Sequence, residues 1–581
     1  MSDHRAQAAQ TARAAAADLA RSRVHPDHRA NGDEERFRSA NHAMTFTKGL
    51  AHDATTGLVE VPGHVDAFRA AIDGGHVAAF TSSVPFAPLQ VGEQLRPWEA
   101  PTAGYAYDLQ GPDAQAVTMP PAPAAGSDEL CYELAEVYEL ALIRDQPLTD
   151  LRAGAGNPAI ADSIDRLNGL DYPIDGAAGR ARARGADDEV DEQTVFRGSS
   201  PGVDVGPYLS QFLLIGTADQ PGQATIADGR IRYGPLLIDQ RVPVANPGVD
   251  WMRERATWLT VQNGVDVRDD STLFDGNAAR RFITTPRDLA TYVHDDALYQ
   301  AYLNACLILL AIGSPFDPSF DALSGHGPAW TVTSGGVGAS TPRHAGGFAL
   351  YGGPHILTLV CEVATRALKA VRFQKFNTHL RLRPETLAGR LEYATEIEAA
   401  FPTTGGVFSS MADRMAPTLQ AISAHNPSGS RLLPMAFQEG SPMHPSYGAG
   451  HAAVAGACVT VLKAFFDTDA VLVQGNREGF HRYETGDAPI AYVPDANGDA
   501  LVAETPGSFL TLEHELNKLA ANISIGRNMA GVHYYSDYFD SLRLGEEVAI
   551  GMLEEQALCY PTDPFVVTVP TFDGDVRRIG A

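Results

Sequence analysis

The sequence predicts a mainly α-helical protein, and three observations support this fold class. Its second half contains several long segments whose apolar residues recur at helical spacing, whereas strand-like segments are few and short. Of its 581 residues, 44% are hydrophobic and 20% are charged, which is typical of a soluble globular protein. A chain of this length and composition can bury a sizeable core, so overall disorder is excluded.

The N-terminal part, residues 1–125, is expected to form an arm and a loop-rich region. Its Ala- and Arg-rich start predicts a short helical arm, and the proline-rich stretch that ends this part forbids long helices. Because a loop-rich region of this kind suits subunit contacts, we expect a homodimer or a larger homo-oligomer. The remaining residues, 126–581, are expected to form the helical domain that carries the functional site.

The helices of this domain are predicted from caps and periodicity. Ser127 caps the segment SDELCYELAEVYELALIRD, which has acidic residues in its first turn. Further helices are expected over residues 296–312, 354–376, 449–466, 511–530 and 533–558. Short strands are expected within residues 229–262, and the tail FVVTVPTFDGDVRR is expected to be an edge strand or an extended arm.

Charge and cysteine usage exclude several classes of partner. Lys and Arg number 44 while Asp and Glu number 71, a formal net charge of −27, which argues against binding to nucleic acid or to anionic lipid. No apolar run approaches the about 20 residues that a membrane span requires, and no secretory signal is visible. The five cysteines form no CxxC pair and are expected to be buried free thiols. We therefore expect a cytoplasmic protein.

Three segments of the helical domain carry unusual polar residues, and the first is KFNTHLRLRPE. Arg372, Lys375 and His379 recur at spacings that could share one helical face. Pro384 pushes Arg383 out of the helix into an extended conformation. A lysine point charge and a planar guanidinium suit a tetrahedral oxyanion. Taken alone, however, the segment is better explained as a solvated basic helix end.

The second segment is HPSYGAGH, in which a glycine-bearing loop opens a helix. Exposed backbone N–H groups at such a helix start bind anions. His451 lies in the first turn, where a histidine can serve as a general acid or base. Taken alone, a tightly packed helix start with two incidental histidines, His444 and His451, is an equally good interpretation.

The third segment is SIGRNMAGVHYYSD, where Gly531 allows a break between two helices. His533 and Asp537 are four residues apart, one helical turn, so the carboxylate can hold Nδ1–H and leave Nε2 free as a ligand or nucleophile. Alone, a helix-start histidine beside a surface acid fits equally well. Together and in this order, the three segments describe a site for a tetrahedral oxyanion bonded to histidine, either vanadate or phosphate.

These segments resemble the site motifs of the vanadium-dependent haloperoxidases, and among them the bromoperoxidases of red algae. The resemblance rests on the spacing from Lys375 to Arg383, on the HPSYGAGH loop and on the SxxRxxxGxH segment with Asp537. It implies a fold of two four-helix bundles with additional loops, short helices and a few short strands. It also implies a vanadate cofactor, with hydrogen peroxide, a halide ion and an organic halogen acceptor as reactants.

The resemblance assigns the cofactor-binding residues one by one. His533 would bond to vanadium at its axial position. The equatorial oxygens would be held by Lys375, Arg383, Arg527 and the backbone N–H of Gly450. Vanadium would remain at +5 and act as a Lewis acid.

The resemblance also assigns catalytic and supporting residues. His451 would deprotonate the incoming hydrogen peroxide, and Lys375 would polarise a peroxide oxygen for attack by halide. His444 matches the second histidine of bromoperoxidases, which favours bromide or iodide over chloride. In a supporting shell, Arg372 would shape the halide pocket and Asp537 would orient the vanadium-binding histidine.

Three points qualify the resemblance. Ala449 stands where the family usually has a serine, and a lost hydrogen bond to a charged group is worth about 1.5–3 kcal/mol at most, so weaker vanadate binding or an altered halide preference is expected. Structural calcium, known in red-algal members, is possible but unsupported, because SPFDPSFDALSG offers only Asp317 and Asp321. The alternative function is a phosphatase of the same fold, in which His533 would be phosphorylated and His451 would protonate the leaving group.

Overall fold

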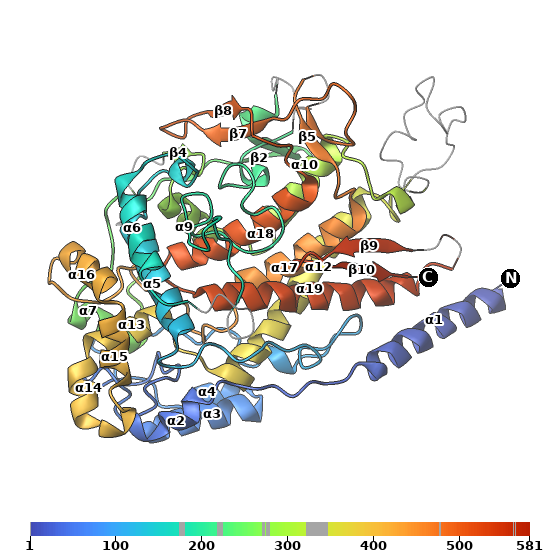
Figure 1. Ribbon diagram of the computed structural model, residues 1–581. Coiled ribbons are helices and arrows are strands. Elements are labelled where there is room, and N and C mark those ends of the chain that lie inside the picture. The colour runs from blue at the N-terminus through green and yellow to red at the C-terminus, as the bar shows by residue number, and fades with distance from the viewer. Residues whose placement is uncertain are drawn as a thin grey trace.

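A computed structural model of the chain describes residues 2–172, 180–217, 225–269, 273–274, 279–320, 323, 347–475, 478–561, 563 and 565–580. Helices dominate these residues, and each named strand pairs with one other strand in a two-stranded antiparallel ribbon (Figure 1). The predicted mainly α fold class, with a few short strands, is therefore confirmed.

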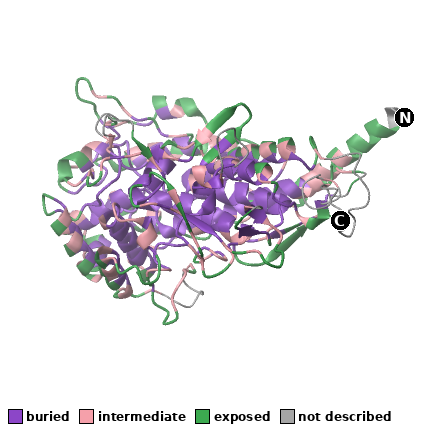
Figure 2. Ribbon diagram, turned by 90° about the horizontal axis from the view of Figure 1, so that it is seen from above, coloured by how far each residue is buried: buried purple, intermediate pink, exposed green. Residues whose placement is uncertain are grey.

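Four long helices run through the centre of the molecule. They are α12 (Gly353–Phe373), α17 (Gly450–Phe465), α18 (Leu512–Met529) and α19 (Tyr535–Ala557). Helix α17 contacts the other three and is buried along almost its whole length. Figure 2 shows that the buried residues are concentrated in the centre of the molecule. It approaches α19 closely at two glycines, since a Cβ on Gly456 would lie 1.9 Å from Leu542 O and one on Gly545 would lie 1.9 Å from Ala453 O.

One predicted helix is displaced, and its neighbour was missed. The helix expected over residues 296–312 is α10 (Gln300–Ala311), and a separate helix, α9 (Pro286–Asp295), precedes it. Thr285 caps α9 by accepting from Asp288 N at 3.2 Å. The break between α9 and α10 matters, because it leaves Asp296 outside both helices and free to turn toward α17.

A second group of helices lies beside the central four. Its members are α5 (Asp128–Leu142), α6 (Pro158–Asn168), α13 (Pro384–Glu392), α14 (Ala394–Ala400), α15 (Val407–Arg414) and α16 (Ala416–His425). The predicted cap of α5 is present, since the Ser127 hydroxyl accepts from Leu130 N at 3.1 Å. Helix α5 packs against α6, α16 and α18, so it joins this group to the central helices.

The N-terminal region packs on the helical domain. Its helices are α1 (Ser2–Ser22), α2 (Asp33–Arg36), α3 (Pro62–Gly74) and α4 (Val77–Ser82). Helix α1 is longer than the short arm expected and projects from the body of the molecule (Figure 1). Phe68 and Trp98 share a buried cluster with Phe376 and Met443. The domain division at residue 125 stays a prediction, with extensive contacts across it.

The strands are short and peripheral. They are β1 (Arg230–Tyr233), β2 (Leu236–Asp239), β3 (Val242–Pro243), β4 (Arg280–Arg281), β5 (Val471–Val473), β6 (Gly479–His481), β7 (Ala491–Pro494), β8 (Leu501–Glu504), β9 (Val567–Pro570) and β10 (Val576–Ile579). Residues 229–262 hold strands as expected, together with α7 (Arg255–Gln262). The tail forms the hairpin β9–β10 against α17 and α19, where one edge strand or arm was expected.

The cysteines and the helices bear on two further expectations. All five cysteines are free, with Cys131, Cys306 and Cys458 buried, Cys361 half-buried and Cys559 exposed. The prediction of buried thiols is therefore wrong for Cys559, which lies just beyond α19. In the described parts of the chain, no helix combines the length and the apolar character that crossing a membrane requires.

Candidate active site

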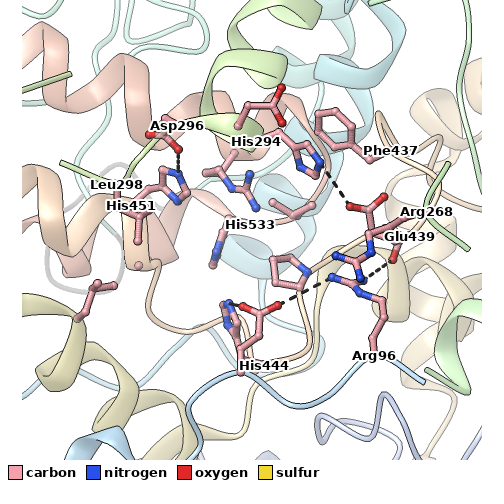
Figure 3. A pocket seen from close by; sticks show the side chains of 18 of the residues that line it. Arg96, Arg268, His294, Asp296, Leu298, Phe437, Glu439, His444, His451 and His533 are labelled. Atoms are coloured by element: carbon pink, nitrogen blue, oxygen red, sulfur yellow. Dashed lines mark hydrogen bonds and ion pairs between the residues drawn. The ribbon is translucent and has the colours of Figure 1, made fainter. Parts of the chain in front are cut away.

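The three polar segments meet at one cavity beside the ends of the central helices, and its volume is about 680 Å³. Figure 3 shows the side chains of His444, His451 and His533 around it. The predicted site residues that line it are Arg372, His444, Gly450, His451, Arg527 and His533. Lys375 and Arg383 lie behind this wall and are fully buried.

Lys375 is placed by an irregular end of α12. The helix continues into a π-helical turn over Gln374–His379, a rare conformation that occurs often at functional sites. The turn lets Lys375 Nζ donate to the carbonyl oxygens of Pro445 and Ser446 at 2.7 and 3.0 Å. The first segment is thereby tied to the loop that precedes α17.

The same turn removes His379 from the site. The expected common face of Arg372, Lys375 and His379 assumes a regular helix, and the π turn rotates the last of these residues away. The His379 ring contacts Tyr447 edge-on at 4.6 Å and does not line the cavity. The expected shared face is therefore wrong for His379.

Arg383 connects the three segments. Its backbone is extended, with φ −81° and ψ 159°, as expected for the residue before Pro384. Its Nε donates to His444 O at 2.9 Å and its Nη2 to His444 Nδ1 at 2.7 Å. Its Nη1 donates to Val532 O at 2.7 Å and lies 3.0 Å from His533 Nε2. Burial lowers the pKa of Arg383 to about 9.

His533 is held in one tautomer. It precedes α19, which begins at Tyr535, so the predicted helix start at residue 533 is two residues early. Its Nδ1 lies 2.7 Å from Asp537 Oδ2, which also accepts from Tyr534 N at 3.2 Å. Because the Arg383 guanidinium only donates, Nε2 accepts and the ring proton sits on Nδ1. The predicted contact between His533 and Asp537 is therefore present. It spans the start of α19 and is not made between two residues within the helix.

A buried network missed by the sequence analysis supports Asp537. Arg381 Nη1 donates to Asp537 Oδ1 at 2.9 Å and to Ser536 Oγ at 2.8 Å, and its Nη2 donates to Glu133. Glu133 comes from α5 and accepts from Ser536 N at 3.0 Å. The network fixes the carboxylate that orients His533. No sequence pattern around Glu133 predicts this role, because nothing distinguishes it from the other acidic residues of α5.

Two arginines at the cavity keep buried donors without partners. Arg527, in the last turn of α18, donates through Nη1 to Val293 O at 2.7 Å, while its Nε is buried and unpartnered within the described structure. Arg372, in the last turn of α12, has a buried Nη1 of the same kind. The nearest carboxylate oxygen to its guanidinium belongs to Glu99, at 3.7 Å. An anion in the cavity would satisfy buried donors of this kind.

The site carries more buried positive charge than its own carboxylate balances. Burial, and then the neighbouring Arg383, hold the pKa of Lys375 well below its usual value. Burial also lowers the pKa of Arg527. Asp537 is already paired with Arg381. Uncompensated buried charge is costly, and a multiply charged anion offsets that cost. The residues present therefore fit a tetrahedral oxyanion such as vanadate.

His451 is paired with a carboxylate from the junction of α9 and α10. Its Nε2 lies 2.9 Å from Asp296 Oδ1, and the other oxygen of Asp296 is buried without a partner in the described structure. An ionised carboxylate only accepts, so Nε2 carries the proton and Nδ1 keeps its lone pair. Sequence reasoning placed Asp296 at a helix start and missed this pairing.

His444 contacts a carboxylate from the N-terminal region. Glu99 Oε2 lies 3.5 Å from His444 Nε2 and 3.7 Å from Arg372 Nη2, and Oε1 lies 3.9 Å from Arg96 Nη2. Burial, and then Arg372, hold the pKa of His444 well below its usual value. Glu99 was missed because it lies more than 270 residues from the motifs in a loop without any recognisable pattern.

The start of α17 explains how Ala449 and Gly450 contribute. Ala449 caps the helix without a side-chain hydrogen bond, and its N–H donates to Ser541 Oγ at 2.8 Å. Gly450 lines the cavity at the first helical position, where backbone N–H groups have no intrahelical acceptor. The substitution of the usual serine thus removes a hydroxyl and leaves the backbone donors of the helix start in place.

The candidate calcium loop gains no support. Asp317 Oδ1 accepts from Ser319 N at 2.8 Å, whereas Asp321 lies outside the described residues. Across the described part of the chain, no group of three or more His, Cys, Asp or Glu side chains is placed to hold a metal ion.

The fold is mainly helical, and the cluster of Lys375, Arg383, Arg527 and His533 fits a tetrahedral oxyanion beside a histidine. Residues 357–558 match the family model described as the VCPO second helical-bundle domain. The chain is 41% identical over 629 residues to the vanadium-dependent bromoperoxidase of Corallina pilulifera, covering 99% of this chain and 98% of that protein. It is 31% identical over 545 residues to the vanadium-dependent bromoperoxidase of Ascophyllum nodosum, covering 92% of this chain and 86% of that protein.

A solved structure agrees with this relationship. The fold is similar to that of the homohexameric second vanadate-dependent bromoperoxidase from Ascophyllum nodosum, with a TM-score of 0.77, 23% sequence identity, and coverage of 99% of this chain and 90% of that one. Given its full-length relatives, the chain belongs to the vanadium-dependent haloperoxidase family, as the three motifs predicted.

Proposed function

We propose that this protein is a vanadate-dependent haloperoxidase, which uses hydrogen peroxide to oxidise a halide ion to hypohalous acid. Bromide and iodide are preferred over chloride as the halide. The hypohalous acid then halogenates an organic acceptor. The main support is the buried cluster of Lys375, Arg383 and Arg527 beside a histidine whose Nε2 is unprotonated. The full-length relatives named bromoperoxidases favour this reaction over hydrolysis through a phosphohistidine.

The cofactor-binding roles follow from the donors in the cluster. The charges of Lys375, Arg383 and Arg527 neutralise the oxygens of orthovanadate, and the N–H of Gly450 adds a backbone donor. Nε2 of His533 supplies the nitrogen ligand, because Asp537 holds the ring proton on the opposite side. Bound vanadium(V) supplies Lewis acidity toward peroxide.

His451 moves the proton that the reaction requires. With Nε2–H directed at Asp296, the basic atom is Nδ1, which takes a proton from hydrogen peroxide entering the cavity. Asp296 then stabilises the resulting imidazolium. A bound anion favours the charged form of Lys375, which then stabilises negative charge that develops on the reacting oxygens.

The halide-binding role falls to Arg372 and His444. The buried Nη1 of Arg372 has no partner within the described structure, so its charge attracts a halide ion. His444 lines the cavity close by, held by Arg383 on one nitrogen and facing Glu99 on the other. We propose that the halide binds between the Arg372–His444 pair and the wall of the cavity that His533 forms.

A homo-oligomeric assembly is part of the proposal. It is supported by the projecting helix α1 and by the homohexameric state of the similar Ascophyllum nodosum structure. The cytoplasmic location stays a prediction of the sequence.

The proposal is tested by bromination of a dye with hydrogen peroxide, before and after orthovanadate is added to protein in phosphate-free buffer. We expect turnover only after vanadate is added, with bromide and iodide used faster than chloride. His533→Ala should retain no vanadium and show no turnover, whereas His425→Ala, a histidine outside the cavity, should behave like the unmodified protein. Hydrolysis of a phosphomonoester without halide oxidation would favour the phosphatase instead.

A further inference from the structure

The loop before α17, residues 444–449, governs two of the donors proposed for vanadate. Lys375 Nζ donates to the carbonyl oxygens of Pro445 and Ser446 at 2.7 and 3.0 Å. Gly450 follows the loop, begins α17 and lines the cavity. A group that fixes this loop therefore also fixes the ammonium group of Lys375 and the backbone N–H of Gly450.

Tyr447 anchors the middle of this loop. Its side chain is fully buried and does not line the cavity. Its hydroxyl lies 2.7 Å from Asp540 Oδ2 and 2.7 Å from Pro120 O. Because Asp540 belongs to α19, the helix that follows His533, this contact ties the loop to the segment that carries the nitrogen ligand proposed for vanadium.

Arg180 holds Asp540 and the Tyr447 hydroxyl together. Its Nε donates to Asp540 Oδ2 at 2.5 Å, and its Nη2 donates to the Tyr447 hydroxyl at 3.3 Å. Its Nη1 donates to Glu129 Oε1 of α5 at 3.0 Å. The side chains of Arg180 and Asp540 are only 10% and 4% exposed, so solvent screens their ion pair much less than one on the surface.

Arg182 makes a similar bridge between the same two helices. It pairs with Glu136 of α5, and its guanidinium lies 3.7 Å from the ring centroid of Tyr535 in α19. Both arginines therefore join α5 to α19. Of the two, Arg180 is the one that donates to the Tyr447 hydroxyl, so the pair separates the bridging of two helices from the holding of the loop.

We propose that Arg180, Asp540 and Tyr447 form an anchor for the loop before α17, and that Tyr447 is a positioning residue for vanadate. This inference rests on the vanadate binding proposed above. The anchor acts before the anion arrives. It holds the two carbonyl oxygens that receive Lys375, and the start of α17, in the arrangement that the anion requires, so less order has to be gained on binding. Tyr447 lies outside the cavity and acts through the loop.

The first test is the affinity of the full-length, vanadate-free protein for orthovanadate, measured by equilibrium dialysis. Tyr447→Phe keeps the ring, which contacts His379 edge-on at 4.6 Å, and removes only the hydroxyl. We expect the affinity to fall about threefold to tenfold, a loss typical of one hydrogen bond. The matched control is Tyr138→Phe, which should bind vanadate like the unmodified protein. Tyr138 is equally buried, and its hydroxyl donates to Arg431 O at 2.7 Å outside the cavity.

Urea unfolding of the vanadate-free variants separates positioning from a general loss of stability. Each tyrosine variant loses one buried hydroxyl, so both should lose stability, whereas only Tyr447→Phe should lose affinity for vanadate. Unchanged affinity for Tyr447→Phe, or equal weakening in the two variants, would overturn the anchor. Absence of vanadate binding by the unmodified protein would instead refute the proposed function.

A double-mutant cycle tests whether the three residues act as one anchor. Arg180→Met and Arg182→Met should both lower stability, because each leaves a buried glutamate without its arginine. Only Arg180→Met should weaken vanadate binding, and combining it with Tyr447→Phe should weaken binding little further, since both changes release the same loop. Equal weakening by the two arginine changes, or additive losses for Arg180→Met and Tyr447→Phe, would contradict a shared anchor. The comparison of the arginine variants stands even if Tyr447→Phe does not fold.

Discussion

Two clusters of buried arginine adjoin the C-terminal end of α18, and they differ in what balances their charge. In the first, Arg144 and Arg287 share the carboxylate of Asp250, with Arg287 Nη2 at 3.2 Å, and Arg144 Nε also donates to Met529 O at 3.0 Å. His425 Nε2 lies 3.1 Å from the other oxygen of Asp250. This cluster contains arginines and a His–Asp pair, and its charges are compensated within the protein.

In the second cluster, Lys375, Arg383 and Arg527 donate to backbone carbonyls and to neutral imidazoles. Its own carboxylate, Asp537, is already committed to Arg381. The comparison shows that buried arginines and His–Asp pairs do not by themselves mark an active site. An excess of buried cations beside a cavity does mark an active site, because only an added anion balances their charge.

The largest difference is expected between the two His–Asp pairs. His451→Ala should lower halide oxidation about 100- to 10,000-fold, the usual contribution of a general base, with vanadium content largely retained. His425→Ala removes a histidine with the same kind of partner outside the cavity and should leave turnover unchanged. Steady-state bromide oxidation with vanadium analysis measures both. A similar loss in the two variants would contradict the assignment of the base to His451.

Asp250→Asn should destabilise the fold by about 3–5 kcal/mol, because it leaves the buried guanidinium of Arg144 without its carboxylate, whereas Arg287 keeps Asp145. Burial alone raises the pKa of Asp250, but Arg144, His425 and Arg287 outweigh it, so the folded pKa lies below the ordinary value. The stabilisation is therefore fully present above about pH 4 and is lost as the pH falls toward the folded pKa. Urea unfolding between pH 7 and pH 3 should show a shallower acid loss for the variant than for the unmodified protein.

Arg527→Met should weaken orthovanadate binding about 100-fold while leaving the stability of the vanadate-free protein unchanged or raised. The reason is that, among the described residues, no carboxylate forms an ion pair with this arginine, which donates instead to Val293 O. Arg287→Met, the matched change in the compensated cluster, should lower stability and leave vanadate affinity unaffected. Equilibrium dialysis and urea unfolding separate the two effects. A loss of stability in the Arg527 variant would place it with the structural arginines.

Ala449→Ser should strengthen orthovanadate binding about tenfold, since it restores a hydroxyl donor worth about 1.5 kcal/mol to a charged oxygen. The backbone bond from Ala449 N to Ser541 Oγ is independent of the side chain and should persist. Equilibrium dialysis checks the affinity, and the ratio of bromide to chloride turnover checks the halide preference. Unchanged affinity would mean that the backbone donors of α17 already suffice.

Glu99→Gln should give the smallest effect, lowering KM for bromide about threefold to tenfold at little change in kcat. The carboxylate lies 3.7 Å from Arg372 and partly cancels its attraction for halide, but solvent screens it because the Glu99 side chain is 43% exposed. Asp266→Asn, a carboxylate paired with Arg268 elsewhere on the cavity wall, is the control. An increase in KM would show that Glu99 positions Arg372 instead of opposing it.

Several parts of the fold and site were predictable because their causes are local. Ser127 caps α5 as its hydroxyl and the acidic turn predict, and Pro384 alone makes Arg383 extended. The glycine-bearing loop placed His451 in the first turn of α17. In each case the deciding interaction involves residues no more than four positions apart, so the sequence contains the whole cause.

Other parts depended on residues that no local pattern marks. The π-helical turn over Gln374–His379 put Lys375 at the loop before α17 and removed His379, although a regular helix would have kept both on one face. The break between α9 and α10 freed Asp296 to reach His451. These local departures are stabilised by contacts with distant segments, so propensity and spacing could not predict them.

The sequence by itself determined the family, the ordered set of motif residues and the helical class, because motifs and periodicity are properties of neighbouring residues. Only the tertiary structure decided that Glu99, Asp296 and Glu133 support the site, and that the three motifs meet at one cavity of about 680 Å³. The physical reason is that these features arise where segments hundreds of residues apart pack together. Which charges are left uncompensated there depends on the packing of the whole chain.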